Sequence, residues 1–143
     1  MATNNATDNA GGSSPVSVTF TPTLIPGSGS FTTITYGSQS GEYVQLGNVV
    51  WFSIAISLTA FVVGTATGSN LLIGTVPALG GTTIPQCSIL LSNVTFVGSP
   101  TAQANGTNFV IIQSVSGTGG TPITCDKLTS SSIIRLSGLY FTS

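Results

Sequence analysis

The sequence predicts an all-β fold, an antiparallel β-sandwich or jelly-roll-like knob, from three observations. Apolar and polar residues alternate with a period of two in most of the apolar runs. Clusters of Gly, Pro, Ser, Thr and Asn separate these runs, and no window of 11 residues combines helical periodicity with good helix formers. A chain of 143 residues suits a single domain. We therefore expect a knob domain at residues 16–143, preceded by an extended N-terminal arm at residues 1–15.

The expected strands follow the alternation along the chain. They lie at residues 16–20, 31–36, 42–50, 52–59, 71–73, 88–97, 108–115 and 133–141. The clearest is the run after Trp51, where Phe52, Ile54 and Leu58 share one face and small polar residues occupy the other. The expected loops lie at residues 25–29, 64–68, 80–81, 98–100, 105–106 and 117–122, where Gly and Pro favour turns.

The scarcity of charge is the most unusual feature of the composition. Only 3% of the residues are charged, against about 25% in an average soluble domain, and histidine is absent. One interpretation is a secreted β domain whose polar faces consist of Ser and Thr. The other, which we favour, is a subunit covered by its neighbours. Monomeric β proteins protect their sheet edges with Lys, Pro or inward charges, and this chain has a single lysine.

The same composition argues against several functions. Two basic residues are too few to neutralise a nucleic acid backbone or to bind an anionic membrane surface. Without histidine a serine nucleophile lacks its usual base. The spacing of Asp8, Glu42 and Asp126 does not indicate a pair of carboxylates for general acid–base catalysis. Cys87 and Cys125 are too few ligands for a metal, and we favour free, buried thiols over a bridge. The sequence predicts a non-enzymatic protein with no cofactor.

Residues 1–15 form a low-complexity segment rich in Asn, Thr, Gly and Ser, with neither the basic start nor the apolar run of a signal peptide. Such a segment buries too little apolar surface to order itself. We therefore expect a partner or a neighbouring copy to hold this arm. Fully extended, it would reach about 50 Å, enough to cross a subunit boundary.

Two residues are candidates for an interface because the alternation turns them away from the core. Trp51 lies opposite the apolar face of the run that follows it, and tryptophan is enriched at interface anchors. Arg135 lies between Ile134 and Leu136 in the final strand. Its alternatives are an ordinary solvent-facing residue and a charge paired across subunits with Glu42 or Asp126.

Three segments resemble landmarks of the knob domains of phage tail fibres. The first is a strand–turn–strand segment at residues 43–52, with Tyr43 and the turn pair Gly47 and Asn48. The second is a short strand running into a corner, with Gly74 and Pro77. The third is the ending with Ser137, Gly138 and Tyr140. Together they cover about residues 40–142, and their order is more specific than any one of them.

This resemblance implies a compact antiparallel sandwich that packs as a homotrimer, whereas the composition alone predicts only self-association. A knob preceded by a short arm favours a capsid decoration, or cement, protein that contacts the major capsid protein and stabilises a phage shell. The alternative is the receptor-binding tip of a tail fibre, which would recognise a host surface glycan through the loops at 64–68 and 117–122. A lectin-like adhesion module outside viruses is a third possibility. In both leading hypotheses the protein resides on the virion surface.

Overall fold

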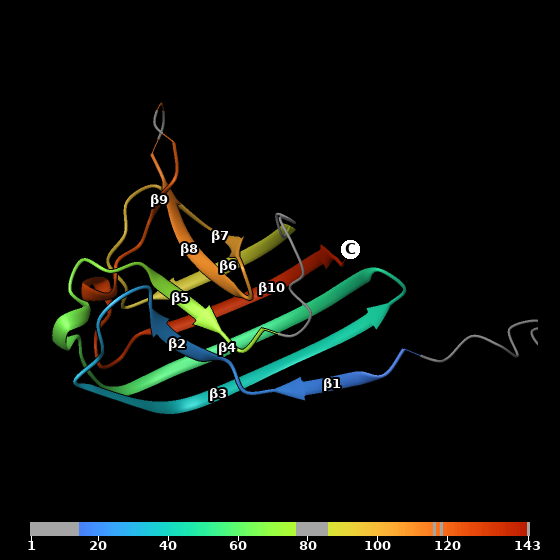
Figure 1. Cartoon of the computed structure of the whole chain (residues 1–143), viewed down its shortest axis with the longest axis horizontal. Coiled ribbons are helices and arrows are strands. Elements are labelled where there is room, and N and C mark those ends of the chain that lie inside the picture. The colour runs from blue at the N-terminus through green and yellow to red at the C-terminus, as the bar shows by residue number, and fades with distance from the viewer. Residues whose placement is uncertain (1–14, 77–85, 116, 118, 143) are drawn as a thin grey trace, which may run out of the picture.

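The computed structural model describes residues 15–76, 86–115, 117 and 119–142, which form an antiparallel sandwich of two sheets (Figure 1). The first sheet has the strand order β1-β3-β4-β10-β6, and the second has the order β2-β5-β8-β7 with β9 paired to β8. The strands are β1 (Ser17–Phe20), β2 (Thr23–Pro26), β3 (Thr33–Leu46), β4 (Val49–Val62), β5 (Leu71–Gly74), β6 (Gln86–Ser92), β7 (Ser99–Asn105), β8 (Asn108–Ser114), β9 (Thr121–Pro122) and β10 (Ile133–Phe141). Two short 3-10 turns, η1 (Gly64–Ala66) and η2 (Cys125–Lys127), complete the fold. The predicted all-β antiparallel class is confirmed.

The β3–β4 hairpin contains the two longest strands of the first sheet, with 14 residues in each. Gly47 and Asn48 make the two-residue turn between them, and Gly47 has a φ of 60°. A glycine with positive φ in the first central position is the requirement of a II′ turn, whose twist matches that of the flanking strands. The hairpin expected at residues 43–52 is therefore present.

The core lies between the two sheets and is built mainly by alternate residues of β4. Phe52, Ile54 and Ile56 are almost fully buried, as the alternation predicted. Across the sandwich, the ring centroid of Phe109 on β8 lies 5.1 Å from that of Phe52 and 6.3 Å from that of Tyr140 on β10. These aromatic contacts pack the two sheets against each other. Burial raises the pKa of Tyr140 to about 12.

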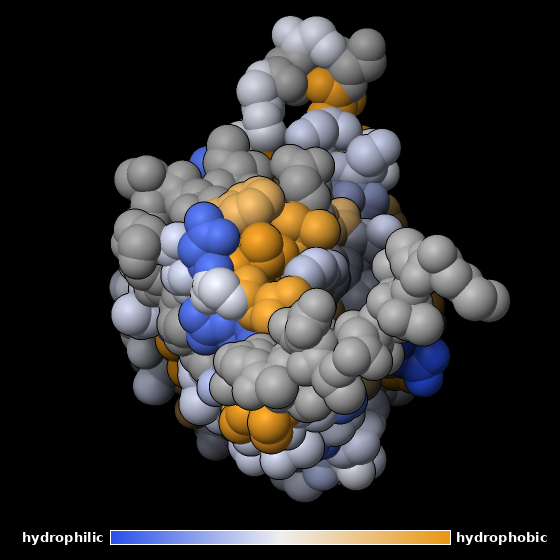
Figure 2. Space-filling view, turned by 90° about the vertical axis from the view of Figure 1, so that its right-hand side faces the viewer, coloured by the Kyte–Doolittle hydropathy of each residue, from blue (hydrophilic) through white to orange (hydrophobic). Residues whose placement is uncertain are grey.

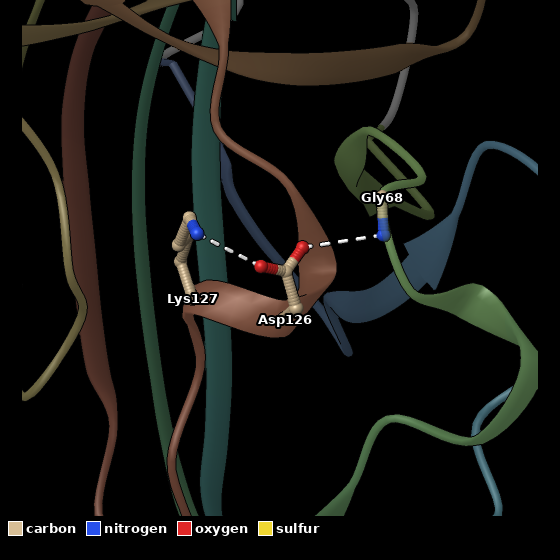
Figure 3. A network of polar contacts seen from close by, with 3 residues as sticks. All are labelled: Gly68, Asp126 and Lys127. Carbon is tan, nitrogen blue, oxygen red and sulfur yellow. Dashed lines mark hydrogen bonds and ion pairs between the residues drawn. The ribbon is translucent and has the colours of Figure 1, made fainter.

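Two polar contacts tie distant segments to the sandwich. The backbone N–H of Leu24 on β2 donates to the Tyr36 hydroxyl on β3 at 2.9 Å, which joins an edge of the second sheet to the first. In η2, Asp126 accepts a hydrogen bond from the Gly68 N–H at 3.2 Å and pairs with Lys127 at 2.9 Å (Figure 3). The ammonium of Lys127, with further hydrogen bonds, holds the pKa of the Asp126 carboxyl well below its usual range.

Several strand predictions were wrong in their bounds. The runs at 31–36 and 42–50 fall mostly in one long strand, β3, which begins at Thr33 and ends at Leu46, whereas Val49 and Val50 belong to β4. The run at 88–97 ends at Ser92, because Asn93 adopts a left-handed φ of 55° and the chain leaves the sheet there. Strands β2, β7 and β9 lie in segments where loops or nothing regular was expected.

Some predictions fall outside the described residues. The arm at residues 1–15 lies outside them except for Pro15, and so does Pro77. At the corner before Pro77, Thr75 has a left-handed φ of 63°.

Both cysteines are free, with Cys125 buried and Cys87 half-buried, as the free-thiol prediction required. Burial raises the pKa of Cys125 to about 11.

Candidate binding face

The side of the first sheet that points away from the core carries both predicted interface residues; we call it the outer face. Trp51 and Arg135 are exposed on it, as the alternation predicted. The register fixes their neighbours, because residues opposite one another in antiparallel strands share a face. Trp51 on β4 lies between Val44 on β3 and Leu139 on β10, and Arg135 on β10 lies between Ala55 on β4 and Leu90 on β6.

The end of the outer face nearest the β3–β4 turn is apolar. Trp51 is 45% exposed and Leu46 is 54% exposed, although both are large apolar side chains. They belong to a set that we call the apolar cluster, formed by register neighbours on three strands: Val44, Leu46, Val49, Trp51, Leu139 and Phe141. Figure 2 views the end of the molecule that carries the turn and the C-terminal strand, and apolar surface lies there beside hydrophilic side chains. Contiguous exposed apolar surface of this kind is typical of an interaction site.

Next to the apolar cluster the outer face is hollowed by a recess of about 380 Å³, which we call the serine recess. Its hydroxyl groups come from Ser40, Ser53, Ser88 and Ser137. Ser53, Ser137 and Ser88 lie directly opposite one another on β4, β10 and β6, so they form a row across three strands. The hollow arises because these side chains and that of Ala55 are short, whereas the neighbouring side chains of Arg135 and Leu90 are long.

Two charged residues face outward near the recess, on different strands. Arg135 lines the recess, and of the charged groups in the described ranges only Lys127 and Asp126 form an ion pair with each other. Glu42 on β3 lies beside Ser53 in the register and accepts a hydrogen bond from the Ser17 hydroxyl on β1. Strand β4 separates Glu42 from β10, so Glu42 stands at the β3 end of the serine row, whereas Arg135 lies in the adjacent row.

The residues of the family resemblance are dispersed rather than gathered into one site. Tyr43 lies half-buried on the core side of β3, with its ring centroid 6.2 Å from that of Phe20, and Tyr140 is buried in the core. Gly47 and Asn48 form the exposed β3–β4 turn, and the carbonyl of Asn48 accepts from the Thr142 N–H at 2.8 Å. Gly74 ends β5, and Gly138 lies in β10 beside Ser137. Of this set only Ser137 lines the serine recess.

Other parts of the described chain offer less for binding chemistry. The two loops predicted for glycan recognition lie apart, because η1 and β9 are at different ends of the sandwich (Figure 1), and residue 118 of the second loop lies outside the described residues. Within the described ranges no three His, Cys, Asp or Glu residues gather as metal ligands. No helix in that part of the chain is long and apolar enough to cross a membrane.

The recess residues were not singled out from the sequence. Ser53 and Ser137 could have been found, since they follow Trp51 and Arg135 by two positions and so point the same way. The contributions of Ser88 and Leu90 could not, because they depend on β6 pairing with β10 rather than with a neighbour in sequence.

Comparison with known proteins found one fold match of consequence. No protein-family model and no curated protein matches the chain. Among solved structures, the crystal structure of the Dettilon tailspike protein (gp208) aligns with a TM-score of 0.69 and 23% sequence identity. The alignment covers 89% of this chain and 24% of the tailspike chain, so this chain spans about a quarter of that protein. The two share a β fold.

Proposed function

We propose that this chain is a non-enzymatic structural module of a bacteriophage tail appendage that assembles with copies of itself through the apolar cluster. The observation that supports this most directly is the exposure of Trp51 and Leu46 side by side on a chain with only five charged residues. A homotrimer is the expected stoichiometry because the tail-fibre knobs that the sequence resembles are trimers.

The outer face is large enough to serve as a standard interface. Strand β10 has nine residues, and the sheet has five strands. With about 3.3 Å per residue and about 4.8 Å between strands, the face measures roughly 30 Å by 20 Å before side-chain relief is counted. A stable interface buries about 800 Å² per partner. A second copy seated on the apolar cluster can therefore bury part of this face, and the rest of the required area has to come from surface next to the cluster.

A tail location is supported by the fold shared with part of a tailspike. The capsid-decoration hypothesis remains a prediction, because it depended on an N-terminal arm that lies almost wholly outside the described residues. Immunogold labelling of purified particles separates the two locations. Label confined to tail ends agrees with the proposal, whereas label distributed over the shell would favour a cement protein.

Sedimentation equilibrium tests the self-assembly. We expect a mass about three times the chain mass of 14.4 kDa for the natural sequence. At about 25 cal/mol per Å², burying the exposed parts of Trp51 and Leu46 contributes about 4 kcal/mol to the association free energy at each contact between two subunits. The variant Leu46→Ser/Trp51→Ser should therefore weaken association by two to three orders of magnitude. Val97→Ser is the matched control, because Val97 is 58% exposed but lies outside the cluster. A natural chain that sediments as a monomer, or a double variant that associates like the control, contradicts the proposal.

A further inference from the structure

The arrangement of rows on the outer face suggests a second role, distinct from self-assembly. The row of Ser53, Ser137 and Ser88 lies next to the row of Ala55, Arg135 and Leu90, one step of two residues along the same strands. Both rows line the serine recess, and neither belongs to the apolar cluster. The recess therefore combines a guanidinium, aligned hydroxyl groups and apolar flanks in one hollow.

Arg135 is the feature that most needs an explanation. The chain has two basic residues, and the other, Lys127, is paired with Asp126 at 2.9 Å. The register neighbours of Arg135 are Ala55 and Leu90, neither of which can accept a hydrogen bond through its side chain. A guanidinium offers five donors in a planar fork that matches a carboxylate in bidentate fashion. In this recess its natural complement is an anion from outside the chain.

We infer that the serine recess binds a carboxylate-bearing saccharide, with the carboxylate on Arg135 and the sugar hydroxyls along the serine row. Serine hydroxyls both donate and accept, which suits the hydroxyl groups of a sugar ring. The side chains of Ala55 and Leu90 provide apolar contact for the C–H face of the ring. The recess volume of about 380 Å³ lies within the range of small-ligand sites.

Glu42 favours a ligand whose negative charge lies at one end only. It stands at the β3 end of the serine row, next to Ser53, whereas Arg135 lies in the adjacent row on β10, two strands away. An anionic group is repelled at that side, whereas a sugar hydroxyl can donate to the carboxylate. A ligand with one negative end and one hydroxylated end matches this polarity, and a compact phosphate dianion does not.

Chemical-shift perturbation in ¹H–¹⁵N spectra of the isotopically labelled full chain tests the inference. The probes are D-glucuronate, D-glucose and inorganic phosphate. We expect saturable shifts with glucuronate at backbone amides of the recess strands β4, β6 and β10, and much smaller shifts with the other two. The variant Arg135→Ala should weaken glucuronate binding roughly 10- to 100-fold, as expected for loss of a charge-assisted pair.

The controls separate this inference from simple charge attraction and from self-assembly. Lys127→Ala removes the other cation, away from the recess, and should leave glucuronate binding unchanged. Ser53→Ala/Ser137→Ala should weaken binding while Arg135 keeps its charge. Equal shifts with glucose or phosphate, equal effects of Lys127→Ala and Arg135→Ala, or no saturable shift would each overturn the inference. So would an Arg135→Ala variant that lowers the sedimenting mass without changing glucuronate binding, since Arg135 would then serve a neighbouring copy.

Discussion

Gly98, just before β7, tests how strongly the end of the β7–β8 pairing depends on a glycine. Its φ of 75° is left-handed, and a Cβ atom placed there would lie 2.0 Å from the carbonyl oxygen of Ser114. Contacts that short do not occur, so the backbone has to move. Gly106, at the turn of the same hairpin, also has a left-handed φ, of 62°, but a Cβ there meets nothing within 4 Å.

The magnitude follows from this difference. A left-handed alanine costs roughly 1–2 kcal/mol wherever it lies, so Gly106→Ala should lose about that much stability. In Gly98→Ala the same cost adds to the separation of Ser99 from Ser114, the end of the β7–β8 ladder. The nearby hydrogen bond from the Val97 N–H to the Gln113 side chain, at 2.9 Å, is also at risk. Two such bonds at about 1 kcal/mol each bring the total to about 3–4 kcal/mol.

Urea denaturation followed by far-ultraviolet circular dichroism measures both variants against the natural chain. For a domain whose stability is about 5–15 kcal/mol, the loss in Gly98→Ala is a large fraction and should shift the midpoint clearly. Equal midpoints for Gly98→Ala and Gly106→Ala would refute the reasoning, because the clash with Ser114 would then cost nothing.

Three further outcomes are expected. Asp126→Asn should lose up to about 1 kcal/mol at neutral pH, because the pair with Lys127 is partly exposed and screened. The folded-state pKa of Asp126 is lowered, so this contribution is complete above the unfolded pKa of about 3.9 and is lost as pH falls through the folded value. Acid titration of both chains by circular dichroism should show the gap closing below about pH 4, and a constant gap would contradict the assignment. Tyr36→Phe should cost about 1–2 kcal/mol in urea denaturation, because the Leu24 N–H loses its acceptor; an unchanged midpoint would mean that water replaces the hydroxyl. Cys125 should react with iodoacetamide much more slowly than Cys87, because it is fully buried and its pKa is raised to about 11; equal alkylation rates by mass spectrometry would contradict this burial.

The strands that could be predicted are those that bury one face and expose the other. In β4 and β10 alternate residues, such as Phe52, Ile54 and Leu136, are apolar because they pack in the core. The two-residue period of these strands is therefore visible in the sequence. The same rule turned Trp51 and Arg135 outward correctly. The fold class follows from these strands, because two long alternating strands need partners on both edges.

The strands that were missed bury little and are imposed by pairing. In β7, with the sequence SPTAQAN, only Ala102 is fully buried, and the strand exists because β8 provides its ladder. In β3, Gly37 and Gly41 weaken any local preference for a strand, yet 13 of the 14 residues pair with β4. Context of this kind overrides propensity. The serine recess escaped prediction for the same reason, since its rows exist only once β6, β10 and β4 are neighbours.

The division of the outer face would allow a chain with so few charges to carry both proposed functions without conflict. Apolar side chains occupy the rows of Trp51 and Val49, whereas hydroxyls and the guanidinium occupy the rows of Ser53 and Ala55. A partner copy on the first pair of rows leaves the second pair accessible at the rim of the interface. The two sets of variants should therefore act independently: Arg135→Ala should preserve the sedimenting mass, and Leu46→Ser/Trp51→Ser should preserve the glucuronate shifts. If the monomeric double variant folds but no longer binds glucuronate, then the two halves are not independent, and a neighbouring copy must complete the recess.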